Sequence, residues 1–439
     1  MKSLLILGGR IFDPGQGIDE TGNILINEGI ISLLGNEGII PEADCTILHA
    51  EGFIVCPGFI DLHCHLREPG YEEKETISTG SKAAARGGFT TICCMPNTDP
   101  PLDNQSGIDY VKSTAEREGA VRVLTIGCIS KERKGEQLAH LKEMAAAGVI
   151  GFSDDGDPAA TSQLMQQALE LSLTLALPII DHCENTALSI GGQMNDGMLA
   201  NKLGLRGIPA AAEETIVARD LALAELTGGR LHIAHASTAG TVKLIRQAKE
   251  RRVRVSAEVT PHHLTLTEER VNGHNTDAKV NPPLRTERDI RALIQGLKEN
   301  VIDIIATDHA PHTKTDKECD FTLAASGISG FETALGSLMS LVHNGQLPLE
   351  TIITKITSAP ARIIGNKYGI IGTLTCGASA DITIFDPDCE WTVDSEDFIS
   401  KGKNTPLDGS RLKGRVIATI AQGEIVYKDD LVQVEENQE

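Results

Sequence analysis

The chain has 439 residues, of which 41% are hydrophobic and 23% are charged, and this composition indicates a globular protein rather than a disordered one. A formal net charge of −21 argues against nucleic acid or an anionic membrane as a partner. No apolar run approaches the roughly 20 residues that a membrane span requires. The 10 cysteines show no regular spacing, which favours a reduced, cytoplasmic protein over a disulfide scaffold.

Both ends of the chain are predicted to consist of short strands and turns. In the N-terminal part, strands are expected at Leu4–Leu7, Asn23–Ile26 and Ile30–Leu34. After residue 365, strands are expected at Ile382–Phe385, Val416–Ala421 and Glu424–Tyr427. The economical interpretation is one small composite β-domain, a β-sandwich that residues 1–55 and 366–439 build together.

Residues 56–365 alternate apolar runs of strand length with amphipathic helical segments. Strands are expected at Val55–Ile60, Thr90–Met95, Val121–Cys128, Val149–Phe152, Pro178–Asp181, Leu231–His235, Arg254–Val259 and Ile302–Ala306. Helices are expected at Ser106–Glu118, Gln137–Ala147, Thr161–Leu173, Ala211–Leu226, Ala239–Arg251, Glu287–Glu299 and Gly330–His343. Apolar strands that alternate with helices are typical of a parallel sheet covered by helices. Eight such units predict a closed (β/α)8 TIM barrel over residues 56–365.

Polar residues stand where these predicted strands end, and in a TIM barrel those ends form the functional face. His63 and His65 are separated by one residue, so on a strand both point to the same side, together with Asp61. The other strand ends carry further nitrogen and carboxylate groups, at Asp154, Asp155, His182, His235 and Asp308. This combination predicts a metal site. Ligands without thiolate suit Zn²⁺, and less often Mn²⁺ or Co²⁺.

The predicted ligands are too many for one tetrahedral site, so we expect two ions with one carboxylate between them. Two Zn²⁺ ions, two aspartates and a bridging hydroxide would leave a small positive charge, which favours an anionic substrate. A water held by metal ions is ionised near neutral pH and can attack a carbonyl that a metal polarises. Arg67, in the loop after His65, is a natural clamp for a substrate carboxylate.

The chain resembles the amidohydrolase superfamily, and within it the dihydroorotases of the bacterial class I type, over essentially its whole length. The motifs that carry this resemblance are FIDLHCHLREPG, GGFTTICCMPNTDPPLDN, FSDDGDP, DHCEN, LHIAHAST, EVTPHHLTLTEE, KVNPPLR and ATDHAPHT. The His-x-His element alone would indicate only the superfamily, whereas the whole set is highly specific.

The resemblance implies roles for individual residues. The ligands of a first metal would be His63, His65 and Asp308, those of a second would be His182 and His235, and Asp155 would bridge the two ions. Asp308 would also be the general acid and base. Contacts to the substrate are expected from His65, Arg67, Asn97, Asn281, His312, Ser326 and Gly327. Many superfamily members bridge their metals with a carboxylated lysine; Val149–Ala160 contains none, which fits class I dihydroorotases and argues against a hydantoinase.

The activity implied by the resemblance is the reversible, zinc-dependent cyclisation of N-carbamoyl-L-aspartate to L-dihydroorotate plus water in de novo pyrimidine biosynthesis, with two zinc ions per subunit. Another cyclic amidohydrolase, such as allantoinase, is the first alternative; Arg67, Asn97, Asn281 and His312 argue against it because they suit a ring with a carboxylate. A non-catalytic scaffold for aspartate carbamoyltransferase is the second, and the presence of all six ligands argues against it. A homodimer and a complex with that enzyme stay open beside the activity.

Several neighbouring polar residues are interpreted as scaffold. They are His232, His262, His263 and His309. Asp154 competes with Asp155 for the bridging position, and the resemblance favours Asp155. One departure concerns Ala325-Ser326-Gly327, where the family often has Pro-Phe-Gly. A backbone contact can survive this change, but we expect a different wall of the substrate pocket.

Overall fold

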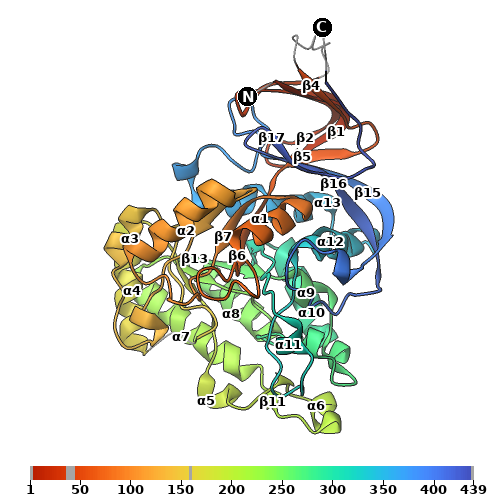
Figure 1. Ribbon diagram of the computed structural model, residues 1–439. Helices are drawn as coiled ribbons and strands as arrows, with labels where there is room; N and C mark the ends of the chain where they lie inside the picture. Colours follow the sequence, from red (N-terminus) through yellow and green to blue (C-terminus); the bar gives the residue numbers. More distant parts are fainter. Residues whose placement is uncertain (1–2, 36–44, 158–160, 437–439) are drawn as a thin grey trace.

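The computed structural model describes residues 3–35, 45–157 and 161–436. A β-sheet built from both ends of the chain lies at one end of a body in which helices surround parallel strands (Figure 1). No helix among the described residues is long and apolar enough to cross a membrane.

The terminal sheet is one continuous sheet of nine strands. Its strands are β1 (Leu4–Asp13), β2 (Ile18–Asn27), β3 (Ile30–Gly35), β4 (Thr46–His49), β5 (Ile54–Pro57), β15 (Ile382–Thr392), β16 (Arg411–Ala421), β17 (Glu424–Lys428) and β18 (Val434–Glu436). The two ends of the chain meet where β5 pairs antiparallel with β15, and again where β4 pairs antiparallel with β18. Ile6, Ile24, Ile382 and Ile420 belong to its buried apolar cluster. The division into domains at 55/56 and 365/366 stays a prediction, and the first boundary falls inside β5.

The run predicted as one strand from Val55 to Ile60 is divided in the structure. β5 belongs to the terminal sheet, whereas β6 (Phe59–Cys64) pairs with β7 (Phe89–Cys94) in the barrel. The division falls at Gly58, whose backbone N–H donates to Asp381 O at 2.8 Å. A Cβ atom at this position would lie 2.2 Å from Thr90 Oγ1. Only glycine therefore allows the segments that contain Gly58 and Thr90 to approach this closely.

The parallel strands form a three-stranded sheet, β6-β7-β8, and a four-stranded sheet, β14-β13-β12-β9. The remaining strands are β8 (Arg122–Thr125), β9 (Ile179–Asp181), β12 (Leu231–Ile233), β13 (Val255–Val259) and β14 (Ile304–Ile305). Single parallel bridges at Phe152 link the two sheets on one side, and a parallel bridge between Cys64 and His309 links them on the other. The strands therefore follow one another around a ring, as the sequence predicts for a TIM barrel.

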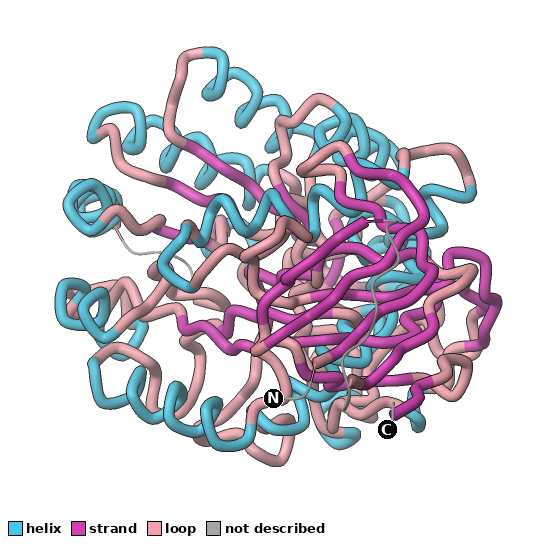
Figure 2. Tube along the Cα trace, turned by 90° about the horizontal axis from the view of Figure 1, so that it is seen from above, coloured by secondary structure: helices cyan, strands magenta, loops and turns pink. Residues whose placement is uncertain are grey.

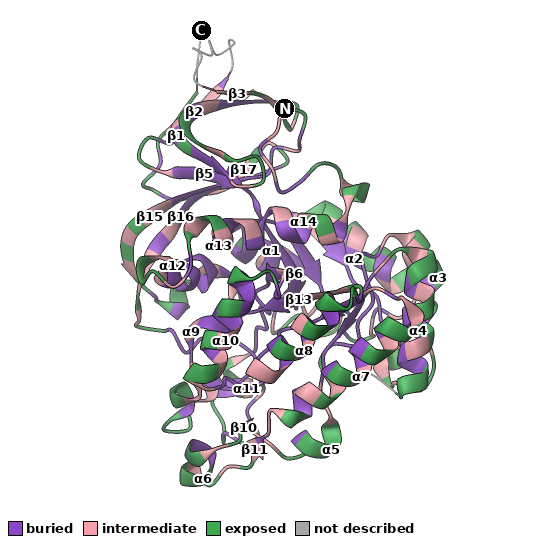
Figure 3. Ribbon diagram, turned by 180° about the vertical axis from the view of Figure 1, so that it is seen from behind, coloured by how far each residue is buried: buried purple, intermediate pink, exposed green. Residues whose placement is uncertain are grey.

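Helices lie on the outside of the barrel strands. In the view from above, the terminal sheet lies in front of the barrel and helices are seen beyond its edges (Figure 2). The helices of the described residues are α1 (Ile77–Arg86), α2 (Gln105–Glu118), α3 (Leu141–Ala147), α4 (Ser162–Leu175), α5 (Thr186–Ser189), α6 (Met198–Leu203), α7 (Ala211–Thr227), α8 (Ala239–Glu250), α9 (Pro261–Thr265), α10 (Glu287–Lys298), α11 (Lys314–Lys317), α12 (Ala334–His343), α13 (Leu349–Ile356) and α14 (Ser358–Ile364). A short two-stranded ribbon, β10 (Met194–Asn195) with β11 (Gly207–Ile208), lies between α5 and α7 in the sequence. The barrel strands are largely buried and the outer faces of the helices are exposed (Figure 3).

One predicted helix is shorter than expected. The sequence predicts a helix over Gln137–Ala147, but α3 begins at Leu141. The preceding residues use their backbone groups elsewhere, because Leu138 forms an antiparallel bridge with Ser130 and Ala139 N–H donates to Ile129 O. A residue whose N–H and C=O are already paired with a neighbouring segment cannot join a helical ladder.

Candidate active site

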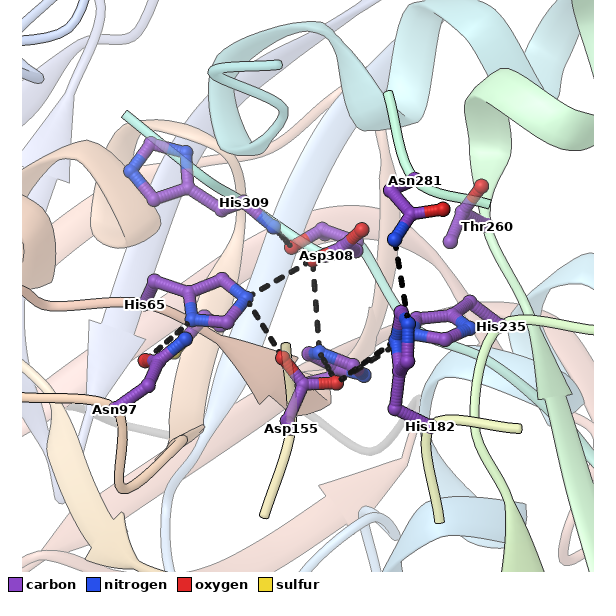
Figure 4. Close-up of polar contacts among 12 residues, drawn as sticks. His65, Asn97, Asp155, His182, His235, Thr260, Asn281, Asp308 and His309 are labelled. Atoms are coloured by element: carbon purple, nitrogen blue, oxygen red, sulfur yellow. Dashed lines mark hydrogen bonds and ion pairs between the residues drawn. The ribbon is translucent and has the colours of Figure 1, made fainter. Parts of the chain in front are cut away.

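The six predicted metal ligands come together at the carboxyl ends of the barrel strands. Figure 4 labels His65, Asp155, His182, His235 and Asp308, and the sixth, His63, lies with its Nε2 3.4 Å from Asp155 Oδ1. Asp155 lies between His65 on one side and His182 and His235 on the other. Beneath them, apolar residues of the same strands fill the barrel, among them Ile60, Leu62, Met95, Ile126 and Ile180. The site thus stands on a packed interior.

A β-bulge turns His63 toward this centre. The register between β6 and β7 shifts between Asp61 and Cys64, so Leu62 and His63 both contact interior residues although they are consecutive. His63 and His65 then face the same centre, as their spacing predicts. Asp61 does not join them: its carboxylate accepts hydrogen bonds from Thr307 N at 2.8 Å and Thr307 Oγ1 at 2.7 Å. Bulges of this kind often re-aim a side chain at an active site.

Two overlapping groups of side chains have the spacing of metal ligands. One consists of His63, His65 and Asp308, and the other of His63, Asp155 and His235. His65 Nε2 lies 3.1 Å from Asp308 Oδ1, and His235 Nε2 lies 3.4 Å from Asp155 Oδ1. His182 completes the cluster, because its Nδ1 lies 2.9 Å from His235 Nε2.

The donor set fits divalent cations. Among the described residues, His63 Nε2 and Asp155 Oδ1 are buried side-chain atoms without a hydrogen-bond partner. Unsatisfied polar atoms in a protein interior are costly, and a bound cation would satisfy both atoms at once. Imidazole and carboxylate ligands suit Zn²⁺ in particular.

The charges of the site are mutually dependent. Burial disfavours the carboxylate form of Asp155, but the imidazoles of His63, His182 and His235 outweigh this effect and hold its pKa well below the usual range. His63 and His65 likewise lower the pKa of Asp308, against the effect of burial. Burial also opposes a charge on His182, yet the neighbouring carboxylates of Asp155 and Glu184 raise its pKa to about 10. The ionised carboxylates of Asp155 and Asp308 are thus stabilised by positive charge at the centre of the site, which protons or metal ions can supply.

The residues predicted to hold a substrate carboxylate lie beside this cluster. Arg67 Nη2 is 3.3 Å from His312 Nε2, and Arg67 Nε donates to Pro311 O at 3.2 Å. His312 Nε2 also lies 2.9 Å from Ser326 O. The Oδ1 atom of Asn97 is 2.8 Å from His65 Nδ1. Burial, together with the charge of Arg67, lowers the pKa of His312 to about 3, so its ring is neutral and next to a cation.

Comparisons with known proteins show the family of the chain. Residues 52–241 match the family model described as Dihydro-orotase-like. A dihydroorotase from Thermoanaerobacter sp. (strain X514) is 50% identical over 428 residues, which cover 97% of this chain and 98% of that protein. A dihydroorotase from Syntrophus aciditrophicus (strain SB) is 49% identical over 428 residues, which cover 97% and 100%, respectively. The chain belongs to the dihydroorotase family.

The solved structures agree with the barrel fold. The L-hydantoinase (dihydropyrimidinase) from Arthrobacter aurescens superposes with a TM-score of 0.88 at 26% identity, covering 100% of this chain and 98% of that one. A D-hydantoinase (dihydropyrimidinase) from Thermus sp. gives a TM-score of 0.84 at 25% identity, covering 99% and 97%. The predicted fold class is therefore confirmed.

In this member of the dihydroorotase family, polar residues next to the predicted ligands form hydrogen bonds or ring contacts with other parts of the protein. Asp154, the rival of Asp155, accepts hydrogen bonds from Ile129 N at 2.9 Å and Ser130 N at 3.1 Å. The ring of His309 stacks on Phe331, with its centroid 4.1 Å away. His263 is bonded to Thr260 and Pro282, and His232 to Ser256 and Glu258.

Two carboxylates with direct contacts to the ligands were not singled out from the sequence. Glu258 Oε1 lies 2.6 Å from His63 Nδ1, and Glu184 Oε2 lies 2.9 Å from His182 Nε2. Glu184 also accepts a hydrogen bond of 2.8 Å from Asn281 Nδ2, a predicted substrate contact. Each carboxylate fixes the hydrogen on one ring nitrogen and leaves the other nitrogen for a metal. The signal for Glu258 is a charged residue within the buried strand Val255–Val259.

Proposed function

We propose that this chain is a dihydroorotase, which interconverts N-carbamoyl-L-aspartate and L-dihydroorotate plus water in pyrimidine biosynthesis. The observation that carries the proposal is the position of Arg67 and His312, 3.3 Å apart, beside six metal-ligand side chains in a member of this family. An arginine beside a neutral histidine suits a ring that bears a carboxylate.

The metal content is also part of the proposal. Two zinc ions would be held by His63, His65 and Asp308 on one side and by His182 and His235 on the other, with Asp155 between them. When bound there, such ions supply an ionised water at neutral pH and polarise the ring amide carbonyl. The two buried, unsatisfied atoms His63 Nε2 and Asp155 Oδ1 support this assignment.

The residues of the chain have distinct tasks in hydrolysis. Arg67, Asn97 and His312 bind the substrate carboxylate and so fix the position of the ring. Asn281 and the backbone at Ser326 and Gly327 contact the ring itself. Asp308 accepts the proton of the attacking water and delivers it to the ring nitrogen as the C–N bond breaks. Its low pKa keeps it ionised at neutral pH. The cyclisation runs through the same steps in reverse.

Asp308 is held in a backbone conformation that non-glycine residues rarely adopt, with φ of 49°. Its N–H donates to His63 O at 2.9 Å, and Thr307 before it is bound by Asp61. These contacts offset the strain and fix the direction of the carboxylate.

Two alternatives are weaker. An allantoinase would act on a ring without a carboxylate and would leave Arg67 without its partner. A non-catalytic scaffold for aspartate carbamoyltransferase would not require a complete set of ligands, and here all six converge. A homodimer, a complex with that enzyme and a cytoplasmic location stay predictions.

Turnover of three substrates tests the proposal. The purified protein is loaded with zinc, its metal content is measured, and dihydroorotate, allantoin and hydantoin are compared. The proposal predicts turnover of dihydroorotate well above that of the other two. Zinc-replete protein that leaves dihydroorotate intact would refute it, and preferential hydrolysis of allantoin would establish the first alternative.

A further inference from the structure

The segment between β15 and β16 lies outside the barrel in sequence but contacts the substrate-binding residues directly. Asn404 in this segment is only 4% exposed. Its Oδ1 atom accepts hydrogen bonds from His312 N at 2.9 Å and from Ser329 Oγ at 2.9 Å. Its Nδ2 atom donates to Ala310 O at 3.1 Å and to Gly327 O at 2.9 Å.

These four contacts use the full hydrogen-bonding capacity of the amide. The orientation of the group is also determined, because the backbone N–H of His312 can only donate and the carbonyls of Ala310 and Gly327 can only accept. Asn404 therefore joins both sides of the loop that bears His312 and Gly327. No other amino acid offers two acceptor and two donor positions in the same compact shape.

The rest of the segment is fixed to the barrel as well. Glu332 accepts hydrogen bonds from Ile399 N at 2.8 Å and Ser400 N at 3.3 Å. Ser329 N–H donates to the backbone oxygen of Asn404 at 2.8 Å. A Cβ atom at Gly402 would lie 2.5 Å from Pro311 Cβ, so the backbone passes directly over the loop. The amide of Asn404 is thus presented from an anchored segment.

We propose that Asn404 is a positioning residue for the carboxylate site, and that it acts by fixing the backbone of His312 and Gly327. The inference rests on the proposed function, since it concerns the groups that would hold the substrate carboxylate. Without the Asn404 amide, the Ala310 carbonyl and the His312 N–H lose their partner, and the Gly327 carbonyl keeps only the hydrogen bond from Lys317 Nζ at 3.1 Å. The His312 ring is then no longer held at a fixed distance from Arg67. A displacement of about 1 Å at a substrate-binding group can cost about 100-fold in kcat/KM.

The test compares Asn404→Ala and Asn404→Asp with Asn23→Ala as a matched control. Asn23 accepts a hydrogen bond from Gly8 N in the terminal sheet and is remote in the fold from the substrate loop. Both Asn404 variants are expected to raise KM for dihydroorotate about 10- to 100-fold, with kcat within about threefold and zinc content unchanged. The Asn404→Asp variant should not rescue binding, because the second oxygen of the introduced carboxylate faces two carbonyls. Asn23→Ala should keep the wild-type KM.

A second measurement separates positioning from general instability. In His312→Ala, Asn404→Ala should add little to the increase in KM, because the ring that Asn404 positions is already absent. Hydrogen exchange of the peptide that contains His312 should accelerate in Asn404→Ala while peptides with the metal ligands on β6 keep their protection. Unchanged KM and unchanged exchange would overturn the proposal, and so would multiplicative effects of the two substitutions. If the wild type does not turn over dihydroorotate, the proposed function fails separately, and exchange alone decides the role of Asn404.

Discussion

The carboxylate of Glu258 is hydrogen-bonded to the ring nitrogen of His63 that faces away from Asp155, with 2.6 Å between Glu258 Oε1 and His63 Nδ1. Its second oxygen, Oε2, lies 3.0 Å from His232 Nε2, so one buried carboxylate connects a proposed metal ligand to β12. Burial disfavours the charge of Glu258, yet the two histidines hold its pKa far below its usual range. Glu258 therefore determines the hydrogen position and the ring orientation of His63.

We predict that Glu258→Ala weakens metal binding or turnover about 10- to 100-fold, the range typical of residues that orient a metal ligand. Zinc affinity, measured by competition with a chelator, checks this. Glu225→Ala, which removes an exposed carboxylate paired with Arg251, serves as the control and should bind zinc like the wild type. Wild-type zinc affinity in Glu258→Ala would show that the contact is not needed.

Asp308→Asn should preserve the fold and abolish most of the activity. The amide has nearly the same shape as the carboxylate but cannot accept the proton of the attacking water. A positioned acid or base contributes about 10²- to 10⁴-fold, so a loss of at least about 100-fold in kcat is expected. Turnover is measured beside the melting temperature and the metal content. Near-normal turnover with full metal content would remove Asp308 from the proton-transfer role.

Arg67→Lys should mainly affect carboxylate-bearing substrates. Lysine keeps the charge but loses the planar pair of donors, and a hydrogen bond to a charged group contributes about 1.5–3 kcal/mol. The kcat/KM for dihydroorotate should therefore fall about 10- to 100-fold. Residual turnover of hydantoin, a ring without a carboxylate, is measured in parallel and should change little. An equal loss with both substrates would contradict the clamp role of Arg67.

The buried carboxyl of Glu332 makes a pH-dependent contribution to stability. Burial raises its pKa to about 7 from an ordinary value of 4.5, although Arg86 and the backbone of Ile399 and Ser400 oppose the shift. The folded state thus binds the proton more tightly than the unfolded state. Its contribution to the free energy of unfolding is most favourable below about pH 4.5, declines as pH rises to about 7, and is constant above that value.

Glu332→Gln removes this pH dependence. The stability of the wild type relative to the variant should fall by up to about 3 kcal/mol between about pH 4.5 and pH 8. Urea unfolding of both proteins at several pH values measures the difference between their free energies of unfolding. The effects of the other titrating groups cancel in this difference. A difference that is independent of pH would show that the pKa of Glu332 is not raised.

Much of the architecture follows from the sequence because the relevant patterns are local. The apolar run Leu231–His235 predicts a strand and is found as β12 at Leu231–Ile233, and the helix predicted at Ala239–Arg251 is found as α8 at Ala239–Glu250. Strand–helix alternation is enough to predict the barrel. The strand break at Gly58 is not visible in this way, since it depends on the approach of Thr90 from a different part of the chain.

The contacts around the ligands depend on residues far apart in sequence. His63 meets Glu258 across 195 positions, and His312 meets Asn404 across 92. A residue pattern in a single sequence cannot indicate such a pairing, whereas the ligands themselves are indicated by their positions at strand ends. The roles of the ligands as such stay predictions until metal and substrate are bound.

The most direct measurement is a zinc titration of metal-free protein with dihydroorotate turnover as the readout. The binuclear account predicts no turnover without metal, a rise as zinc is added, and a plateau at two equivalents per chain. Asp155→Ala, which removes the proposed bridge, should lower the plateau stoichiometry and the activity together. Failure of the fully loaded protein to turn over dihydroorotate, or full activity without any metal, would contradict the account.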